Sequence, residues 1–339
     1  MMDDAATRQL LGAYALDACD DDEVAAVEAL IAHDLDARHE ADRLREVASW
    51  LGATEALAPS AGLRDALLSR ARRVRPAPGD DPALALYVAQ TDRFDALLDE
   101  IRPEQLDVET FNGLTVRELV VHMAAMESAF AASAGSPTIP EVTTEDIEAR
   151  THELIDLFHD RPVADARALW RRSVEALRAW AADASGRLAV PGIDFSMSRH
   201  SALAARAFET WTHDDDVRRA LGRPLVVPPP EHLYVMAEMS TRSLPLALAA
   251  LDKVRPGKKA TLVLTGDGGG TWTVPLDVGV DRPVPGADET SDVVVRLDVV
   301  EWCRLASERL DPTAVMFEAD GEVELVDDLF AAAPAFATL

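Results

Sequence analysis

Three side chains of this sequence have the types and the spacing of a metal site: His122, Glu209 and His213. Glu209 and His213 are four residues apart, so that in a helix both would project from the same face. A third nitrogen ligand from a facing helix would complete a set of two histidines and one carboxylate. Catalytic zinc uses such a set when a fourth position stays open for water or substrate. The trio therefore predicts a divalent-metal site, with zinc favoured.

The same residues also have simpler explanations. An E-x-x-x-H pair occurs by chance in many acidic chains, and a carboxylate beside an imidazole can be an ion pair without a metal. Arg206 lies on the same helical strip and could pair with Glu209, leaving nothing for a metal. Asp216, on that strip as well, could instead accept a hydrogen bond from a ligand imidazole and orient it. The spacing permits a metal site and leaves these alternatives open.

Two predicted helices must position the trio. His122 lies in "TVRELVVHMAAMESAF", which begins with a capping box formed by Thr115 and Glu118. It borders the apolar stripe of that helix, so it should point into the protein interior, where a neutral histidine needs a partner or a metal. Glu209 and His213 lie in a helix that starts near Ser198 and stops at Gly222, a C-terminal signal.

These helices belong to a predicted helical bundle at residues 83–251. Other helices are expected over about 144–159 and 163–184, and in "PPPEHLYVMAEMSTRSLPLALAAL". The first helix of the bundle has an apolar face made of Leu84, Val88, Phe94, Leu98 and Ile101. Bundle cores are where facing helices assemble metal sites, so the trio lies in a suitable context.

The chain before the bundle also has a helical pattern. Residues 1–75 are predicted to be all helix, and residues 76–82 a linker because of their proline, glycine and aspartate content. Two helices are expected first, followed by a short basic helix, "GLRDALLSRARRVR". The first should open with a capping box of Asp20 and Glu23 and bury Val24, Val27 and Ile31; the second should bury Leu44, Val47 and Leu51.

The chain after the bundle changes period and predicts a small α+β domain at residues 258–339. "ATLVLTG" and "TWTVPLDVGV" alternate apolar and polar residues around "GDGGG", which indicates a β-hairpin. A strand in "SDVVVRLD", a helix in "VVEWCRLASERL", a strand in "AVMFEAD" and a helix in "VELVDDLFAAA" should follow. The glycines do not form a phosphate loop, because strands flank them and no Gly-Lys-Ser/Thr follows. The expected fold class is mainly α with an α+β C-terminal domain.

Composition limits the partners and the compartment. The net charge is −27 and the only lysines are Lys253, Lys258 and Lys259, so nucleic acid and anionic membranes are disfavoured as partners. No apolar run could cross a bilayer and the start lacks a signal peptide, so the protein is expected in the cytoplasm. Two cysteines exclude a disulfide framework: Cys303 should be a buried apolar residue, and carboxylates near Cys19 should raise its pKa.

The segments "LTVRELVVHMA" and "MSRHSALAARAFETWTHDDDVRRALG" resemble the mycothiol-dependent maleylpyruvate isomerase family, within the larger DinB-like group of metal-binding four-helix proteins. The resemblance covers roughly residues 83–251, and the tail resembles that family's sterol-carrier-like C-terminal domain. It implies that His122, Glu209 and His213 are the ligands of a divalent metal, usually zinc. One departure is Leu114, where the family often has a tryptophan, so that the pocket wall should differ.

The resemblance also implies an activity. In the family the metal binds the sulfur of mycothiol, a low-molecular-weight thiol of actinobacteria, and stabilises the thiolate that attacks an electrophile. In the isomerase itself the thiolate adds to a cis double bond, allows rotation and leaves; in sister proteins S-transfer or S-conjugation is expected. The protein is therefore expected to be an isomerase or S-transferase that acts on a small electrophile.

The N-terminal residues resemble a different class of protein. "LLGAYALDACDDDEVAAVEALIAHDLDARHEADRLRE" is similar to the zinc-binding domain of bacterial anti-sigma factors, whose zinc-ligand positions hold Leu30, Asp34 and Ala37 here. Those ligands are lost, and a substitute zinc set of His33, Asp34 and His39 is disfavoured because structural zinc sites favour cysteine. A metal-free helical domain is expected.

Two further functions compete with the enzyme. The first is a regulator that binds a sigma factor through residues 1–75 and uses the bundle as a sensor without turnover. The second is a protein whose trio is vestigial and which only binds an apolar ligand in its tail. The intact trio favours the enzyme, whereas the N-terminal resemblance favours the regulator.

Overall fold

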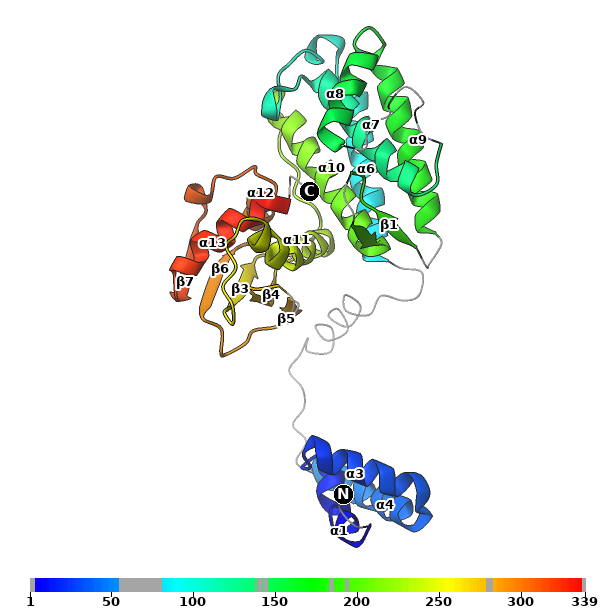
Figure 1. The fold of residues 1–339 in the computed structure, drawn as a ribbon, viewed down its shortest axis with the longest axis vertical. Coiled ribbons are helices and arrows are strands. Elements are labelled where there is room, and N and C mark those ends of the chain that lie inside the picture. The colour runs from blue at the N-terminus through cyan, green and yellow to red at the C-terminus, as the bar shows by residue number, and fades with distance from the viewer. Residues whose placement is uncertain are drawn as a thin grey trace. The chain divides into compact units, whose positions relative to one another are not determined.

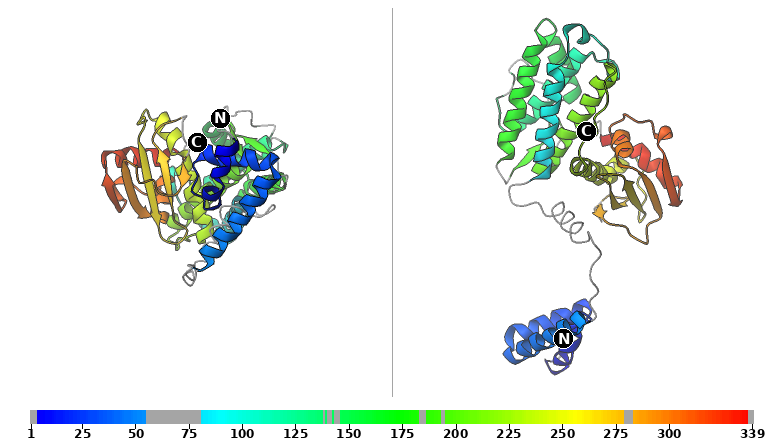
Figure 2. Two further views of the ribbon diagram at one scale, coloured as in Figure 1. Left: turned by 90° about the horizontal axis from the view of Figure 1, so that it is seen from below. Right: turned by 180° about the vertical axis from the view of Figure 1, so that it is seen from behind.

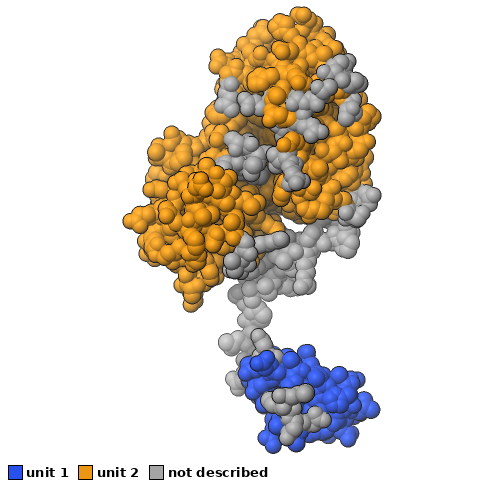
Figure 3. Space-filling model, viewed as in Figure 1, with its two compact units in different colours: residues 1–70 blue, residues 71–339 orange. Residues whose placement is uncertain are grey.

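The chain folds into two compact units, residues 1–70 and residues 71–339 (Figure 3). The computed structural model describes residues 4–54, 81–137, 139, 142, 146–182, 186–192, 195–278 and 283–336. The predicted basic helix and residues 76–80 of the predicted linker lie outside the described residues. The fold class is as expected, with a mainly helical chain and a C-terminal region that contains a sheet (Figure 1).

Unit 1 is helical throughout its described part. It contains α1 (Asp4–Gln9), α2 (Leu11–Ala15), α3 (Asp21–His33) and α4 (Leu35–Thr54). The predicted capping box at Asp20 and Glu23 is confirmed. The unit buries a small apolar cluster made of Leu11, Val27, Leu30, Ala37 and Ala41.

One predicted core position of unit 1 is wrong. Val47 is 54% exposed, because the buried strip of α4 runs through Ala37, Ala41 and Leu44 at helical spacing. The next position on that strip is Ala48, which is half-buried. Val47 therefore faces away from the other helices of the unit.

A four-helix bundle forms the first part of unit 2. Its helices are α6 (Pro82–Asp99), α7 (Val116–Ser133), α9 (Val163–Ala181) and α10 (Arg199–Ala220), which lie side by side in Figures 1 and 2. α6 packs on α10, and α7 packs on α9, with α8 (Ile147–Phe158) added against the outside of α7. The capping box at Thr115 and the end of α10 before Gly222 are as predicted.

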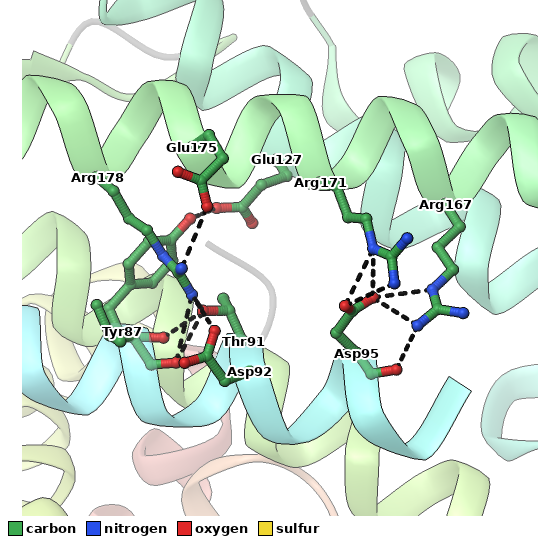
Figure 4. Close-up of polar contacts among 10 residues, drawn as sticks. Tyr87, Thr91, Asp92, Asp95, Glu127, Arg167, Arg171, Glu175 and Arg178 are labelled. Atoms are coloured by element: carbon green, nitrogen blue, oxygen red, sulfur yellow. Dashed lines mark hydrogen bonds and ion pairs between the residues drawn. The ribbon is translucent and has the colours of Figure 1, made fainter. Parts of the chain in front are cut away.

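Arginines of α9 hold that helix to α6. Arg167 and Arg171 both reach Asp95, at 2.8 Å, and Arg178 lies 2.6 Å from Asp92 (Figure 4). Because most of these side chains are partly exposed, each pair contributes little alone. Together they fix which faces of α6 and α9 meet.

A hairpin lies between α9 and α10, and a further helix follows α10. A two-stranded antiparallel hairpin, β1 (Arg187–Ala189) with β2 (Ser196–Ser198), precedes α10 and was not predicted. α11 (Pro230–Ala250) follows α10 and contacts α6 and α10 as well as the C-terminal elements β4, α12 and α13. The Trp302 indole of α12 donates to Ser240 Oγ of α11 at 2.9 Å, inside this contact.

The C-terminal part is a five-stranded sheet in the order β5-β4-β3-β6-β7. The predicted hairpin is confirmed, with β3 (Lys259–Thr265) antiparallel to β4 (Gly270–Pro275). β6 (Val293–Asp298) runs parallel to β3, and β5 (Val284–Pro285) and β7 (Phe317–Gly321) are the antiparallel edge strands. Helices α12 (Val299–Ala306) and α13 (Glu324–Ala332) pack with α11 against this sheet (Figure 1).

The glycine-rich turn between β3 and β4 is required by packing. Gly268 has φ +87°, and a Cβ there would lie 2.3 Å from the Pro230 carbonyl oxygen at the start of α11. The turn thus joins the sheet closely to α11, in agreement with its interpretation as a hairpin and not as a phosphate loop.

The cysteines also behave as expected. Cys303 is fully buried on α12, and burial raises the pKa of its thiol. Desolvation raises the pKa of the Cys19 thiol, with further contributions from Glu23 and Asp20. Neither thiol is activated as a nucleophile.

Candidate metal centre

α7 and α10 bring the three predicted ligands together. His122 lies in the second turn of α7, while Glu209 and His213 lie one turn apart in the middle of α10. Donor atoms of the three side chains all lie within 4.8 Å of one another. Among the described residues this is the one group of three such side chains that could hold a metal ion. His33, Asp34 and His39 of unit 1 do not form such a group.

The two imidazole rings approach each other edge to face. The ring centroids of His122 and His213 are 5.0 Å apart and the rings are inclined by 78°. His122 Nε2 lies 3.6 Å from Glu209 Oε1, which is too long for a strong hydrogen bond. The three side chains therefore lie close enough together to bind one ion.

Each histidine is oriented through its other ring nitrogen. Nδ1 of His122 lies 3.1 Å from the Thr151 hydroxyl of α8, and Nδ1 of His213 lies 3.0 Å from Asp216 Oδ2. With Nδ1 occupied in both rings, Nε2 is the nitrogen left for the centre. The predicted role of Asp216 as an orienting acceptor agrees with this contact.

Arg206 pairs with Glu209, which is the alternative to a metal site that the sequence left open. The pair nevertheless leaves one oxygen of the Glu209 carboxylate available. Its guanidinium binds Glu209 Oε2, whereas Oε1 is the oxygen that faces His122. Arg206 also binds Glu127 Oε2 of α7 at 2.9 Å, and the Tyr87 hydroxyl of α6 donates to the other oxygen of Glu127. The ion pair and the metal site are thus compatible.

This network holds Glu209 and His122 in the protonation states of metal ligands. Burial alone would raise the pKa of Glu209, but the charge of Arg206, together with His122, holds it well below its usual range. Burial lowers the pKa of His122, even though Glu209 opposes this. At neutral pH the carboxylate is therefore ionised and the His122 ring is neutral, as binding of a metal requires.

Asp216 is in turn held from the C-terminal part of the unit. Arg309 Nε and Nη2 donate to its two oxygens at 2.8 and 2.7 Å. Burial alone would raise the pKa of Asp216, but the hydrogen bonds from Arg309 and His213 lower it. Asp216 therefore stays ionised and can accept a hydrogen bond from His213.

Four supporting residues were missed from the sequence: Tyr87, Glu127, Thr151 and Arg309. One of them had a signal, because Glu127 is a lone charge in the apolar run "MAAMESAF" and a buried charge needs a partner. The others are brought to the site only by the packing of separate elements.

The donor set fits a divalent metal. Two imidazole nitrogens and one carboxylate oxygen form a set that zinc accepts with a further position open, and other first-row metals also bind such ligands. The set is supported in the way that metal sites usually are, with a hydrogen-bonded partner behind each ligand.

Residues 87–218 match the family model described as the mycothiol maleylpyruvate isomerase N-terminal domain. This part of the chain is therefore similar to that family. The matched residues run from α6 to the end of α10 and include the whole trio. The predicted resemblance is confirmed for this domain. Residues 1–75 lie outside the match, so their resemblance to anti-sigma factors and the sigma-factor partner stay predictions.

Two solved structures of the mycothiol-dependent maleylpyruvate isomerase are similar to the chain, one of them a histidine-to-alanine mutant. Each is 18% identical, covers 70% of this chain and 91% of its own chain, and superposes with a TM-score of 0.48. No curated protein matches the chain. In the described part of the chain, no helix is both long and apolar enough to span a membrane.

Proposed function

We propose that this protein is a metal-dependent enzyme that uses a low-molecular-weight thiol, with mycothiol as co-substrate, to isomerise or conjugate a small electrophile. The observation that carries the proposal is the convergence of His122, Glu209 and His213 inside a domain similar to the mycothiol maleylpyruvate isomerase family. Zinc is the metal we expect.

The residues of the chain would divide the work as follows. His122 and His213 would bind the metal through Nε2, and Glu209 through Oε1. Arg206 keeps Glu209 ionised, while Thr151 and Asp216 fix the two rings. When bound, a divalent metal supplies a Lewis acid that stabilises a thiolate at neutral pH.

The charge of the site supports an anionic sulfur ligand. Two neutral imidazoles and one carboxylate neutralise only part of a divalent charge, and Glu209 already shares its own charge with Arg206. The chain itself offers no thiol for this role, since Cys303 is buried and has a raised pKa. An external thiol is therefore the nucleophile that we propose.

Maleylpyruvate is the first electrophile to test. The thiolate sulfur would form a bond to one carbon of the cis double bond, the electron pair of that double bond would form a new double bond towards the conjugated carbonyl carbon, and the carbonyl pair would move onto its oxygen. Rotation about the resulting carbon–carbon single bond, return of the electrons and cleavage of the carbon–sulfur bond would release the trans isomer and the thiolate.

The test is metal content by plasma mass spectrometry on protein purified without a metal-affinity tag. We expect about one zinc per chain in the wild type and almost none in His122→Ala or His213→Ala. His159→Ala is the matched control, because His159 is an exposed histidine at the end of α8 and should leave the zinc in place.

Activity is measured next, as isomerisation of maleylpyruvate with and without mycothiol. Turnover that needs both zinc and the thiol would support the proposal. A wild-type protein that binds no zinc after reconstitution would refute it and would leave the sigma-factor regulator as the better account.

A further inference from the structure

Two arginines near the end of α12 reach carboxylates of α10 in the bundle. Arg309 makes a bidentate pair with Asp216, at 2.8 and 2.7 Å, and both side chains are buried, at 8% and 1% exposure. Arg304 reaches the neighbouring Asp215 through a single longer contact of 3.4 Å. Of these two carboxylates, Asp216 is the one in contact with the trio.

Asp216 connects Arg309 to His213. Its Oδ2 lies 2.7 Å from Arg309 Nη2 and 3.0 Å from His213 Nδ1, so that both groups bind the same oxygen. An ionised carboxylate can only accept hydrogen bonds, so His213 must carry a proton on Nδ1 to complete this contact. In the neutral ring Nε2 is then the nitrogen that carries the lone pair, and it is the one available to the candidate metal centre.

Arg309 itself is held on several sides. Its Nη1 donates to the Ser307 carbonyl at 2.6 Å, and its guanidinium carbon lies 3.8 Å from the centre of the Phe111 ring, in the segment that leads into α7. The turn after α12 directs it, because Glu308 has φ +59° and the Arg309 amide returns to the Arg304 carbonyl. Nε, Nη1 and Nη2 thus each donate to a group within the protein, which holds the guanidinium in place.

We propose that Arg309 is a positioning residue for His213: it fixes the Asp216 carboxylate, which fixes the tautomer and orientation of the imidazole. This inference rests on the proposed function and deepens it, because its effect on metal binding requires that the trio binds a metal. It gives the C-terminal part of the unit a direct role in the site of the bundle. Outer partners of metal-binding histidines commonly change metal affinity about 10- to 100-fold when they are removed.

The first measurement is the zinc dissociation constant of the full chain, by competition with a chromogenic chelator. Arg309→Met keeps the length and the contact with Phe111 but removes the donors, and we expect zinc binding to weaken about 10-fold or more. Arg309→Lys keeps the charge without the bidentate geometry and should fall between wild type and Arg309→Met. If Arg309→Met fails to fold, Arg309→Lys is compared with the wild type in its place.

Arg304→Met is the matched control. It removes an arginine that leaves the same helix region and pairs with the adjacent carboxylate of α10, yet this carboxylate does not touch the trio. A loss of zinc affinity in Arg304→Met equal to that in Arg309→Met would overturn the inference, because the effect would then be a general weakening of the contact with α10.

The second measurement does not depend on metal. Nitrogen-15 NMR of the metal-free protein reports the tautomer of His213, whose signal is assigned by its loss in His213→Gln. We expect the Nδ1-protonated form in the wild type and in Arg304→Met, and a mixture of tautomers in Arg309→Met. An unchanged tautomer in Arg309→Met would overturn the inference even if zinc affinity fell.

The two measurements also separate the inference from the proposed function. If the wild type binds zinc while Arg309→Met retains both its affinity and its tautomer, the inference alone fails. If the wild type binds no zinc, the proposed function fails, and the tautomer measurement still decides whether Arg309 positions His213.

Discussion

Histidines and carboxylates gather at two helix pairs of this protein, α7 with α10 in unit 2 and α3 with α4 in unit 1. In unit 2, His122, Glu209 and His213 converge on one point. In unit 1, His33 Nδ1 contacts the Ala29 carbonyl at 2.6 Å, and Asp34 Oδ1 accepts from the Ala37 amide at 2.9 Å. The same residue types thus face a shared centre in one unit and their own backbone in the other.

The difference lies in the residues behind the potential ligands. In unit 2, Thr151, Asp216 and Arg206 each occupy one atom of a ligand and leave another atom facing the centre. In unit 1, Asp34 caps α4 and pairs with Arg8, while Leu30 and Ala37 are buried in the apolar cluster. A metal site is therefore defined by the partners that orient the ligands as much as by the ligands.

The largest difference in stability between the two units is expected when the arginine that pairs with a potential ligand is removed from each. Arg206→Met would leave the buried Glu127 and the partly buried Glu209 without this counter-charge, and we expect a loss of about 3–5 kcal/mol in the free energy of unfolding. Arg8→Met removes a partly exposed pair and should cost at most about 1 kcal/mol. Urea unfolding is followed by tryptophan fluorescence, to which unit 2 contributes five tryptophans and unit 1 only Trp50, and by circular dichroism, which reports both units.

The double variant Arg206→Met/Glu127→Gln is the control for this prediction. It removes one of the two stranded charges and should recover part of the loss. Equal effects of Arg206→Met and Arg8→Met would contradict the view that the network of unit 2 is buried and interdependent.

Zinc should stabilise unit 2 and leave unit 1 unchanged. At a free zinc concentration about 100 times the dissociation constant, the expected gain is about 2.7 kcal/mol, because the metal binds the folded state alone. Thermal unfolding with and without zinc measures it, and His213→Ala should abolish the gain. Stabilisation of unit 1 by zinc would show that the His33, Asp34 and His39 set binds metal after all.

Mild acid should weaken metal-free unit 2. Burial lowers the pKa of His122, so below its usual value of about 6.5 the unfolded chain takes up this proton before the folded chain does. Stability should therefore fall as the pH drops below about 6.5 towards the folded pKa, by at most about 1.4 kcal/mol per pH unit. The measurement is the urea midpoint at pH 7.5 and 5.5.

His122→Gln provides the reference for this prediction. Other groups contribute to the pH dependence, among them Asp215, whose pKa is raised by burial, and the difference between wild type and variant removes them. If His122→Gln shows the same acid dependence as the wild type, His122 is not the group responsible.

A small effect is also expected at the helix junction of unit 1. Asp34→Ala removes the side-chain acceptor for the Ala37 amide at the start of α4 and should cost about 1 kcal/mol. Asp34→Asn keeps an acceptor and should cost less. Circular dichroism measures both, and zinc content should stay the same in each variant.

The sequence predicted the local structure and the ligand trio because both depend on short spacings. Capping boxes, the i, i+4 relation of Glu209 and His213, and the contact of Asp216 with His213 all lie within one or two helical turns. His122 was added as a ligand from a facing helix because it borders the apolar stripe of its own helix, and the family resemblance supported this, since nothing local relates α7 to α10.

What could not be predicted depends on packing between distant segments. The pairing of Glu127 with Arg206 and of Asp216 with Arg309 spans 79 and 93 residues. The hairpin of β1 and β2 was missed because strands of three residues have too little periodicity to detect. Val47 was misplaced because two apolar strips could be drawn on α4, and only the packing of α4 against its neighbours decides between them.

The position of α11 has a consequence for how this protein can be divided. Tyr234 of this helix lies with its ring 5.4 Å from that of Trp272 in β4, while other residues of the helix pack on α6 and α10. A fragment ending at residue 251 would expose the sheet-facing side of α11, and a fragment beginning at residue 258 would lack one of the helices that cover its sheet. Each fragment should aggregate when produced alone, so the segment from 82 to 336 should be expressed as one piece, and a tail from another protein could replace this one only if it matched α11.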